Sequence, residues 1–245
     1  DRLFVIQSRS VKYQNLFCRV DVLVKEGNQI HLIEVKAKSV DGSKVDPFQR
    51  RNGNVLSEWK PYVLDVAFQR HVLTSAFPEY AVRASLMLVD KSQACTVNGL
   101  LSNFKIQNED GRTSCVRIND EPICHEILTT KPVDEAIDQV CKEDYDGRTF
   151  EENIQWLSDQ YAKDIKTPPS IGKHCKTCEF RCKGDADNQM KNGFRECWTE
   201  VLGWKDQDFD RPTIFDLYYF RNLEAYIEQR CILLDELDAD ALNVR

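Results

Sequence analysis

Long apolar runs are missing from this 245-residue chain. No stretch approaches the 18 or so apolar residues that a membrane-spanning helix needs, and no basic and apolar leader resembles a signal peptide. With 42% hydrophobic and 30% charged residues, the composition is that of a globular protein of one large or two small domains. We therefore expect a cytoplasmic protein without membrane contact. The chain also opens without an initiator methionine, so we expect further domains or subunits upstream of it.

The chain also lacks an excess of basic residues, because its net charge is -7. This argues weakly against a nucleic-acid partner, because Lys and Arg provide most of the affinity for phosphates. A cleft of catalytic carboxylates would, however, contribute negative charge that bound metal ions offset. Local basic groups are candidate nucleic-acid contacts, with solvated surface as the alternative. They are Lys38, Arg50 and Arg51 in the first part of the chain, and Lys163, Lys166, Lys173, Lys176, Arg181 and Lys183 around a group of cysteines.

What the sequence does contain is a hairpin pattern between residues 19 and 39, with two apolar runs joined by a Gly-Asn turn signal. Side chains alternate between the two faces of a strand, so Glu34 and Lys36 point the same way. If residues 19–25 pair antiparallel with residues 30–37, Asp21 comes to the same strand end as Glu34. An ordinary amphipathic hairpin with an exposed ion pair is the alternative to a functional site here.

The pattern of Asp21, Glu34 and Lys36 on adjacent strands resembles the PD-(D/E)XK nuclease superfamily, and in particular its RecB-like branch. The resemblance implies that Asp21, Glu34 and the backbone carbonyl of Val35 bind Mg²⁺ or Mn²⁺, which prefer oxygen ligands. It also implies that Lys36 helps to position or activate the attacking water, and that DNA is the substrate.

A helix is predicted from about Ser57 to Ala76, with a proline in its first turn. On it, Asp65 and Gln69 are one turn apart and face alike. RecB-like nucleases carry a Q-x-x-x-Y motif on the helix that follows the E-x-K strand. Gln69 matches the glutamine, which the resemblance places near the metal site, whereas Leu73 stands at the tyrosine position.

The predicted fold is α/β, with a mixed central sheet flanked by helices in a restriction-endonuclease-like core, followed by a mostly helical subdomain that carries the cysteines. We place the boundary near residue 130, which gives a nuclease-like core over residues 1–130 and the subdomain over 131–245. The pattern predicts strands at 3–8, 16–25, 30–37 and 81–91 and short strands near 94–98, 104–107 and 115–118. It predicts helices at 133–142, at 150–163 with a capping box of Thr149 and Glu152, and near 213–237.

Four of the ten cysteines are clustered in the sequence. Their spacing, C-x2-C-x3-C and a fourth cysteine further on, is typical of a closed four-thiolate site, which would pin helical segments together. RecB-like nucleases of the AddB and CRISPR-associated exonuclease type hold a [4Fe-4S] cluster with three cysteines after the core, spaced C-x2-C-x5-C. The resemblance implies such a cluster here; structural Zn²⁺ is the alternative, with His174 as a substitute for one thiolate. The candidate ligands are Cys175, Cys178, Cys182 and Cys197.

The leading functional expectation is a metal-dependent DNA exonuclease that acts on single strands or ends in genome maintenance or phage defence. A catalytically silent nuclease fold that binds nucleic acid or a protein partner is the second expectation. A purely structural zinc protein would explain the cysteines but not the hairpin.

Overall fold

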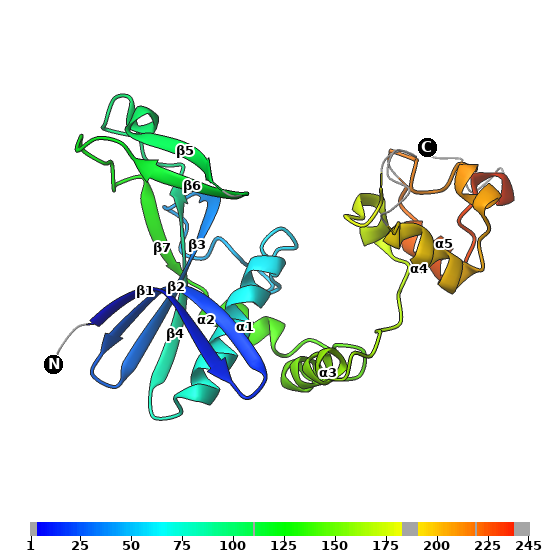
Figure 1. Cartoon of the computed structure of the whole chain (residues 1–245), viewed down its shortest axis with the longest axis horizontal. Helices are drawn as coiled ribbons and strands as arrows, with labels where there is room; N and C mark the ends of the chain where they lie inside the picture. The colour runs from blue at the N-terminus through cyan, green and yellow to red at the C-terminus, as the bar shows by residue number, and fades with distance from the viewer. Residues whose placement is uncertain (1–3, 110, 183–190, 219, 238–245) are drawn as a thin grey trace. The chain divides into compact units, whose positions relative to one another are not determined.

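The computed structural model describes residues 4–109, 111–182, 191–218 and 220–237, and divides the chain into two compact units, Asp1–Ile165 and Lys166–Arg245. We call them the sheet unit and the small unit. The sheet unit has a mixed five-stranded sheet in the order β1-β2-β3-β4-β7 and a separate two-stranded sheet of β5 and β6 (Figure 1). Its strands are β1 (Phe4–Tyr13), β2 (Leu16–Glu26), β3 (Gln29–Val40), β4 (Ala81–Asp90), β5 (Phe104–Glu109), β6 (Arg112–Arg117) and β7 (Leu128–Pro132).

The first three strands form an antiparallel meander, and β3 continues through helix α1 (Lys60–Ala76) into β4, which lies parallel to β3. A crossover helix is the usual connection between parallel strands. The predicted strands at 3–8, 16–25, 30–37 and 81–91 and the predicted helix at 57–76 are confirmed, with Pro61 in the first turn of α1. The short strand predicted near residues 94–98 is wrong, because those residues form turns before the two-stranded sheet.

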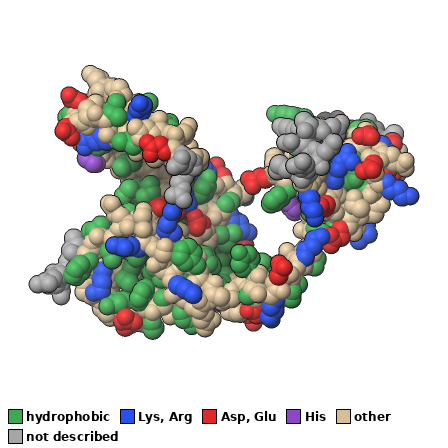
Figure 2. All heavy atoms as spheres, viewed as in Figure 1, with side chains coloured by type: hydrophobic (Ala, Val, Ile, Leu, Met, Phe, Trp, Pro, Cys, Tyr) green, Lys and Arg blue, Asp and Glu red, His purple; other side chains and the backbone are tan. Residues whose placement is uncertain are grey.

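The core of the sheet unit lies between the sheet and its helices. The buried face of α1 presents Val63, Val66, Val72 and Leu73, each fully buried, to β1, β2 and β4. Some apolar side chains of β1, an edge strand, stay at the surface, as do other hydrophobic side chains of the sheet unit that Figure 2 shows in green.

The division between the units falls later than the predicted boundary near residue 130. Strand β7 pairs with β4 across residues 128–132, and helix α2 (Asp134–Val140) packs against α1, so both belong to the sheet unit. Helix α3 (Phe150–Ala162) follows, and Thr149 and Glu152 form the predicted capping box at its start.

The small unit contains short helices around a separate apolar cluster. They are η2 (Lys173–Thr177), α4 (Gly193–Leu202), η3 (Asp206–Asp210), α5 (Leu223–Glu228) and η4 (Leu234–Glu236). The long helix predicted near residues 213–237 is wrong. Thr213 instead forms a β-bridge with Leu233, and the chain folds back to bury Ile214 against Ile232 in the same cluster. Burial of these side chains outweighs the local helical preference.

None of the helices in the described ranges has the length and apolar content that a membrane crossing needs.

Candidate functional site

The hairpin of β2 and β3 brings Asp21 next to Glu34. The two strands pair as far as Val22 and Ile33, and Asp21 and Glu34 are the next residue on each strand. There the backbone N–H of Val35 donates to Asp21 Oδ2 over 2.9 Å. The carboxylate of Asp21 therefore lies against the backbone beside Glu34, at the strand end where the sequence predicts it.

Glu34 is the buried centre of a hydrogen-bond network of side chains that joins β3 to α1. Only 7% of the residue is exposed. Its Oε1 accepts a hydrogen bond from Lys36 Nζ over 2.7 Å, and its Oε2 accepts one from Gln69 Nε2 over 3.0 Å. A buried carboxylate needs such charge-assisted partners, because burial without them is costly. Gln69 thus lies at the predicted site.

Asp65, which lies on α1 one turn before Gln69, is the fourth member of this network. Lys36 Nζ donates to Asp65 Oδ2 over 2.6 Å, and Gln69 Nε2 donates to Asp65 Oδ1 over 3.2 Å. The predicted common orientation of Asp65 and Gln69 is therefore confirmed. The sequence alone does not predict the ion pair of Asp65 with Lys36. The available signal was the position of Asp65, four residues before Gln69 on the same helix face.

The ammonium group of Lys36 is held between two carboxylates. Burial lowers the pKa of Lys36, but the hydrogen bonds and negative charges of Asp65 and Glu34 outweigh this effect and raise the pKa above its ordinary value. Lys36 is therefore a protonated cation at neutral pH. In this arrangement it donates hydrogen bonds to Glu34 and Asp65.

Strand β3 has an irregularity at the site. Its parallel pairing with β4 runs to Val35 and Met87 and resumes at Ser39 and Val89, so residues 36–38 lie opposite a single residue of β4. Such bulges change the direction of side chains and often occur beside functional sites. Lys36 and Lys38 are both within this bulge.

Lys38 is covered by aromatic rings. Its Nζ lies 4.4 Å from the ring centre of Trp59 and 4.9 Å from that of Tyr62, and donates to the backbone oxygen of Glu58 over 2.9 Å. Arg50 and Arg51, the other two predicted nucleic-acid contacts of the hairpin region, are exposed on a tight turn between β3 and α1. Neither guanidinium has an ion-pair partner within the part of the chain that the structure describes.

Leu73, at the tyrosine position of the Q-x-x-x-Y motif, is fully buried in the core of the sheet unit. It is one turn beyond Gln69 but does not reach solvent. The aromatic side chain on the site's side of α1 is instead Tyr62, whose ring centre lies 5.9 Å from Lys36 Nζ.

The residues suit a hard divalent cation in their chemistry. Among the described residues no group of three or more His, Cys, Asp and Glu side chains could hold a metal ion. Mg²⁺ commonly uses one or two carboxylates together with water and substrate oxygens. Asp21 and Glu34 offer two carboxylates, whose Oδ2, Oε1 and Oε2 accept hydrogen bonds within the protein. Gln69 Oε1 adds a buried oxygen that has no hydrogen-bond partner in the described structure.

The four predicted cysteine ligands belong to the small unit. Cys175 is buried, Cys178 and Cys197 are partly buried against the same apolar cluster, and Cys182 is exposed with its Sγ 3.8 Å from the backbone oxygen of Lys191. Burial raises the pKa of Cys197, and the nearby Cys178 and Cys175 raise it further, so these three thiols are neighbours. His174, the predicted substitute ligand, instead contacts the backbone oxygen of Ser170 through Nε2 over 3.2 Å.

The basic residues around the cysteines are mostly engaged within the protein. Lys166 pairs with Glu200, Lys173 with Glu224, and Lys176 donates to the backbone oxygen of Leu217. Lys183 lies outside the described residues. The side chains of Lys163 and Arg181 have no ion-pair partner among the described residues, so these two remain the candidates for a ligand contact.

No protein-family model matches the chain, and no functionally characterised protein or solved structure is detectably similar to it. The site's function therefore has to be inferred from its own geometry.

Proposed function

We propose that the chain is a metal-dependent nuclease of the PD-(D/E)XK type, RecB-like in its arrangement, which hydrolyses phosphodiester bonds of DNA at ends or in single strands. The observation that carries this proposal is the convergence of Asp21, Glu34, Lys36 and Gln69 from β2, β3 and α1. An exposed ion pair on an amphipathic hairpin would not need a buried glutamate with hydrogen bonds to both oxygens.

Asp21, Glu34 and the backbone carbonyl of Val35 would hold Mg²⁺ or Mn²⁺. The metal, when bound, supplies a water of lowered pKa and neutralises charge on the phosphate. Gln69 holds Glu34 Oε2 in place, which fixes the direction of the carboxylate. Lys36 remains protonated and can donate a hydrogen bond to the attacking water or to a phosphate oxygen. Lys38, Arg50 and Arg51 supply positive charge for the nucleic-acid backbone.

Cys175, Cys178, Cys182 and Cys197 would bind a [4Fe-4S] cluster or, alternatively, Zn²⁺ in the small unit. Cys175, Cys178 and Cys197 border one apolar cluster, which supports a structural role, although no three of the described cysteines are placed as metal ligands. The absorption spectrum and the metal content of the purified protein distinguish the two, because an iron-sulfur cluster is coloured and zinc is not.

The first prediction tests the nuclease. We expect Glu34→Ala to abolish Mg²⁺- or Mn²⁺-dependent cleavage of single-stranded DNA, because the variant loses the buried carboxylate of the site. Glu26→Ala is the matched control, since it removes an exposed carboxylate from the same hairpin. Circular dichroism confirms that both variants are folded. Undiminished cleavage by folded Glu34→Ala would contradict the assignment.

A catalytically silent nucleic-acid-binding module is the second candidate, and it is favoured by the buried Leu73 at the tyrosine position and by the internal pairing of both Glu34 oxygens. Binding of single-stranded DNA by the wild-type chain, without cleavage in Mg²⁺ or Mn²⁺, would identify this module.

A further inference from the structure

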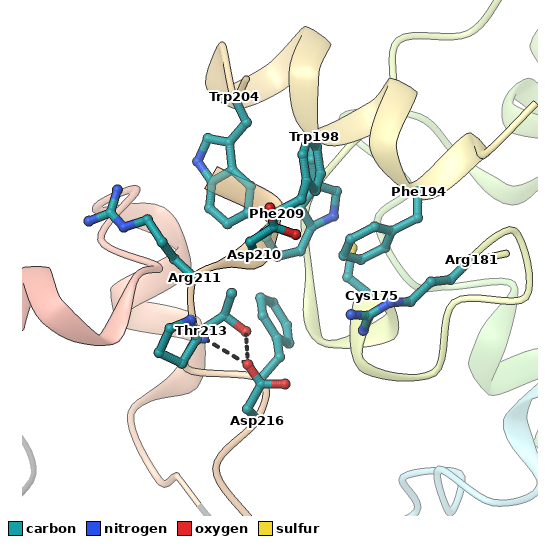
Figure 3. A pocket seen from close by; sticks show the side chains of 12 residues that line it. Cys175, Arg181, Phe194, Trp198, Trp204, Phe209, Asp210, Arg211, Thr213 and Asp216 are labelled. Carbon is teal, nitrogen blue, oxygen red and sulfur yellow. Dashed lines mark hydrogen bonds between the residues drawn. The ribbon is translucent and has the colours of Figure 1, made fainter. Parts of the chain in front are cut away.

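The small unit contains an aromatic pocket of about 280 Å³ that the proposed catalytic residues do not use. Figure 3 shows its lining side chains, which come from α4, η3 and the segments around Cys175 and Thr213. Ligand pockets of proteins are mostly about 300–1,000 Å³, so this one suits a small ligand.

Aromatic rings form one part of the pocket's lining, beside charged side chains. The ring of Trp198 lies 4.5 Å from that of Phe194 and 4.7 Å from that of Trp204, measured between centres, and Trp204 lies 5.3 Å from Phe209. Trp198 and Phe194 are buried, whereas Trp204 is partly exposed. These rings pack against one another at interplanar angles of 32°, 67° and 75°, so the indole face open to a planar ligand is that of the partly exposed Trp204.

One buried polar atom of a side chain that lines this pocket has no hydrogen-bond partner among the described residues. Trp198 is only 1% exposed, and its Nε1 has no hydrogen-bond acceptor within the described ranges. The indole hangs from α4 toward the other labelled side chains (Figure 3). A buried indole N–H normally finds an acceptor, so a ligand atom with a lone pair would satisfy it.

Two charged groups at the edge of the pocket are also available. The guanidinium of Arg181 stacks over Phe194 at 4.7 Å and has no carboxylate partner among the described residues. The carboxylate of Asp210 likewise makes no hydrogen bond there. The other two charged lining residues are occupied: Arg211 pairs with Asp235, and Asp216 accepts from the backbone N–H and the hydroxyl of Thr213, as the dashed lines in Figure 3 mark.

The free groups define the ligand's chemistry. The partly exposed ring of Trp204 can stack on a planar ligand, and Trp198 Nε1 lacks an acceptor. The exposed Asp210 and Arg181 can pair with a donor and with an anionic group. A nucleobase carries both acceptors and donors on a flat ring, and its phosphate provides the anion. We propose that this pocket binds a nucleotide, with the base among the aromatic rings and the phosphate at Arg181. Its identity as the terminal nucleotide of a single strand rests on the proposed nuclease function.

Calorimetric titration of the full chain without added divalent metal tests the proposal, with adenosine monophosphate, adenosine and ribose 5-phosphate as probes. We expect adenosine monophosphate to bind most tightly, adenosine about tenfold more weakly, and ribose 5-phosphate weakest. Arg181→Ala should weaken the monophosphate about tenfold or more and leave adenosine unchanged, because it removes only a charge-assisted contact. Trp204→Ala should weaken both by about tenfold, since stacking on one ring is lost.

Arg148→Ala is the matched control, because Arg148 stacks on Trp156 in the sheet unit and does not line this pocket. It should leave all three affinities unchanged. No binding of adenosine monophosphate at millimolar concentration, or equal binding of ribose 5-phosphate and the monophosphate, would overturn the proposal. Arg181→Ala keeps the test decisive if Trp204→Ala does not fold, since Arg181 is exposed.

The same titration separates this pocket from the nuclease site. Glu34→Ala should bind adenosine monophosphate as the wild type does, because Glu34 belongs to the sheet unit. If the chain binds the nucleotide but has no nuclease activity, the nucleotide-binding proposal stands, and only the identification of the ligand as the end of a DNA strand is lost. Cleavage without nucleotide binding would overturn the pocket and leave the nuclease proposal intact.

Discussion

In the sheet unit, the buried amide of Gln69 keeps its Oε1 without a hydrogen-bond partner, and in the small unit the buried indole of Trp198 keeps its Nε1 without one. These are the two such side-chain atoms within the described ranges, and they are of opposite kinds. An unpaired acceptor beside carboxylates suits a cation or a water, whereas an unpaired donor beside a free guanidinium suits an anionic ligand with acceptors. The two units therefore present opposite kinds of unpaired buried atom, an acceptor in one and a donor in the other.

The units also differ in how their structures are maintained. The sheet unit has an extended core of strands and helices. In the described part of the small unit the core has six buried residues, which are Cys175, Phe194, Trp198, Ile214, Phe215 and Ile232. Loss of one large side chain therefore removes a far greater share of the core in the small unit.

The largest effect on stability is expected from Trp198→Ala. Removing a buried Trp side chain costs about 3–5 kcal/mol, which is enough to unfold a unit with so small a core while the sheet unit stays folded. Limited proteolysis should then cleave residues after about 166 and leave the sheet unit resistant. Trp156→Ala, at a partly exposed position of α3, is the control. If the sheet unit became equally sensitive in Trp198→Ala, the two units would not be independent.

An intermediate effect is expected from pH on the sheet unit. Burial raises the pKa of the Cys18 thiol to about 11, with smaller contributions from the charges of Asp65 and Glu34. The folded state keeps this proton at a pH where the unfolded chain releases it. The stabilisation is thus fully present below about pH 9, the ordinary thiol value, and is lost as the pH rises toward 11, by about 2–3 kcal/mol.

Urea unfolding of the sheet unit at pH 8 and pH 11 measures this loss, and Cys18→Ala isolates the thiol's share from that of other groups. The variant should lose less stability than the wild type over the same interval. An equal loss in both proteins would show that Cys18 does not titrate as its burial requires.

The smallest effect is expected from Thr149→Ala at the start of α3. The hydroxyl of Thr149 accepts the N–H of Glu152 over 3.2 Å, and the Glu152 side chain accepts the N–H of Thr149 over 2.8 Å. Loss of such a cap costs about 1 kcal/mol in urea unfolding. Gln155→Ala, in the middle of the same helix and exposed, should cost less. A cost of Thr149→Ala no greater than that of Gln155→Ala would mean that the capping box adds nothing to the sheet unit.

Much of the sheet unit could be predicted from the sequence, because its signals are local. Alternation in residues 30–37 places Glu34 and Lys36 on one face, and the spacing of Asp65 and Gln69 places them on one side of a helix. The bond between Lys36 and Asp65 could not be derived in this way, since it depends on how α1 lies across the sheet. Pairing across 29 residues is a property of tertiary packing.

The small unit was harder to predict for the same reason. Residues 213–237 have helical local patterns, yet Thr213 and Leu233 pair with each other and their neighbours form the core. Nothing in the local sequence signals that Trp198, Trp204 and Phe209 line a pocket, because α4, η3 and the segments around Cys175 and Thr213 all contribute to it.

The bulge in β3 has a mechanical consequence for the site. Where three residues of one strand lie opposite one of its neighbour, the hydrogen-bonded ladder does not hold each residue in a fixed place. Lys36 is held instead by Glu34 and Asp65, and Lys38 by the backbone oxygen of Glu58 and the rings of Trp59 and Tyr62. The positions of these two ammonium groups therefore depend more on α1 and the residues before it than on the neighbouring strand β4.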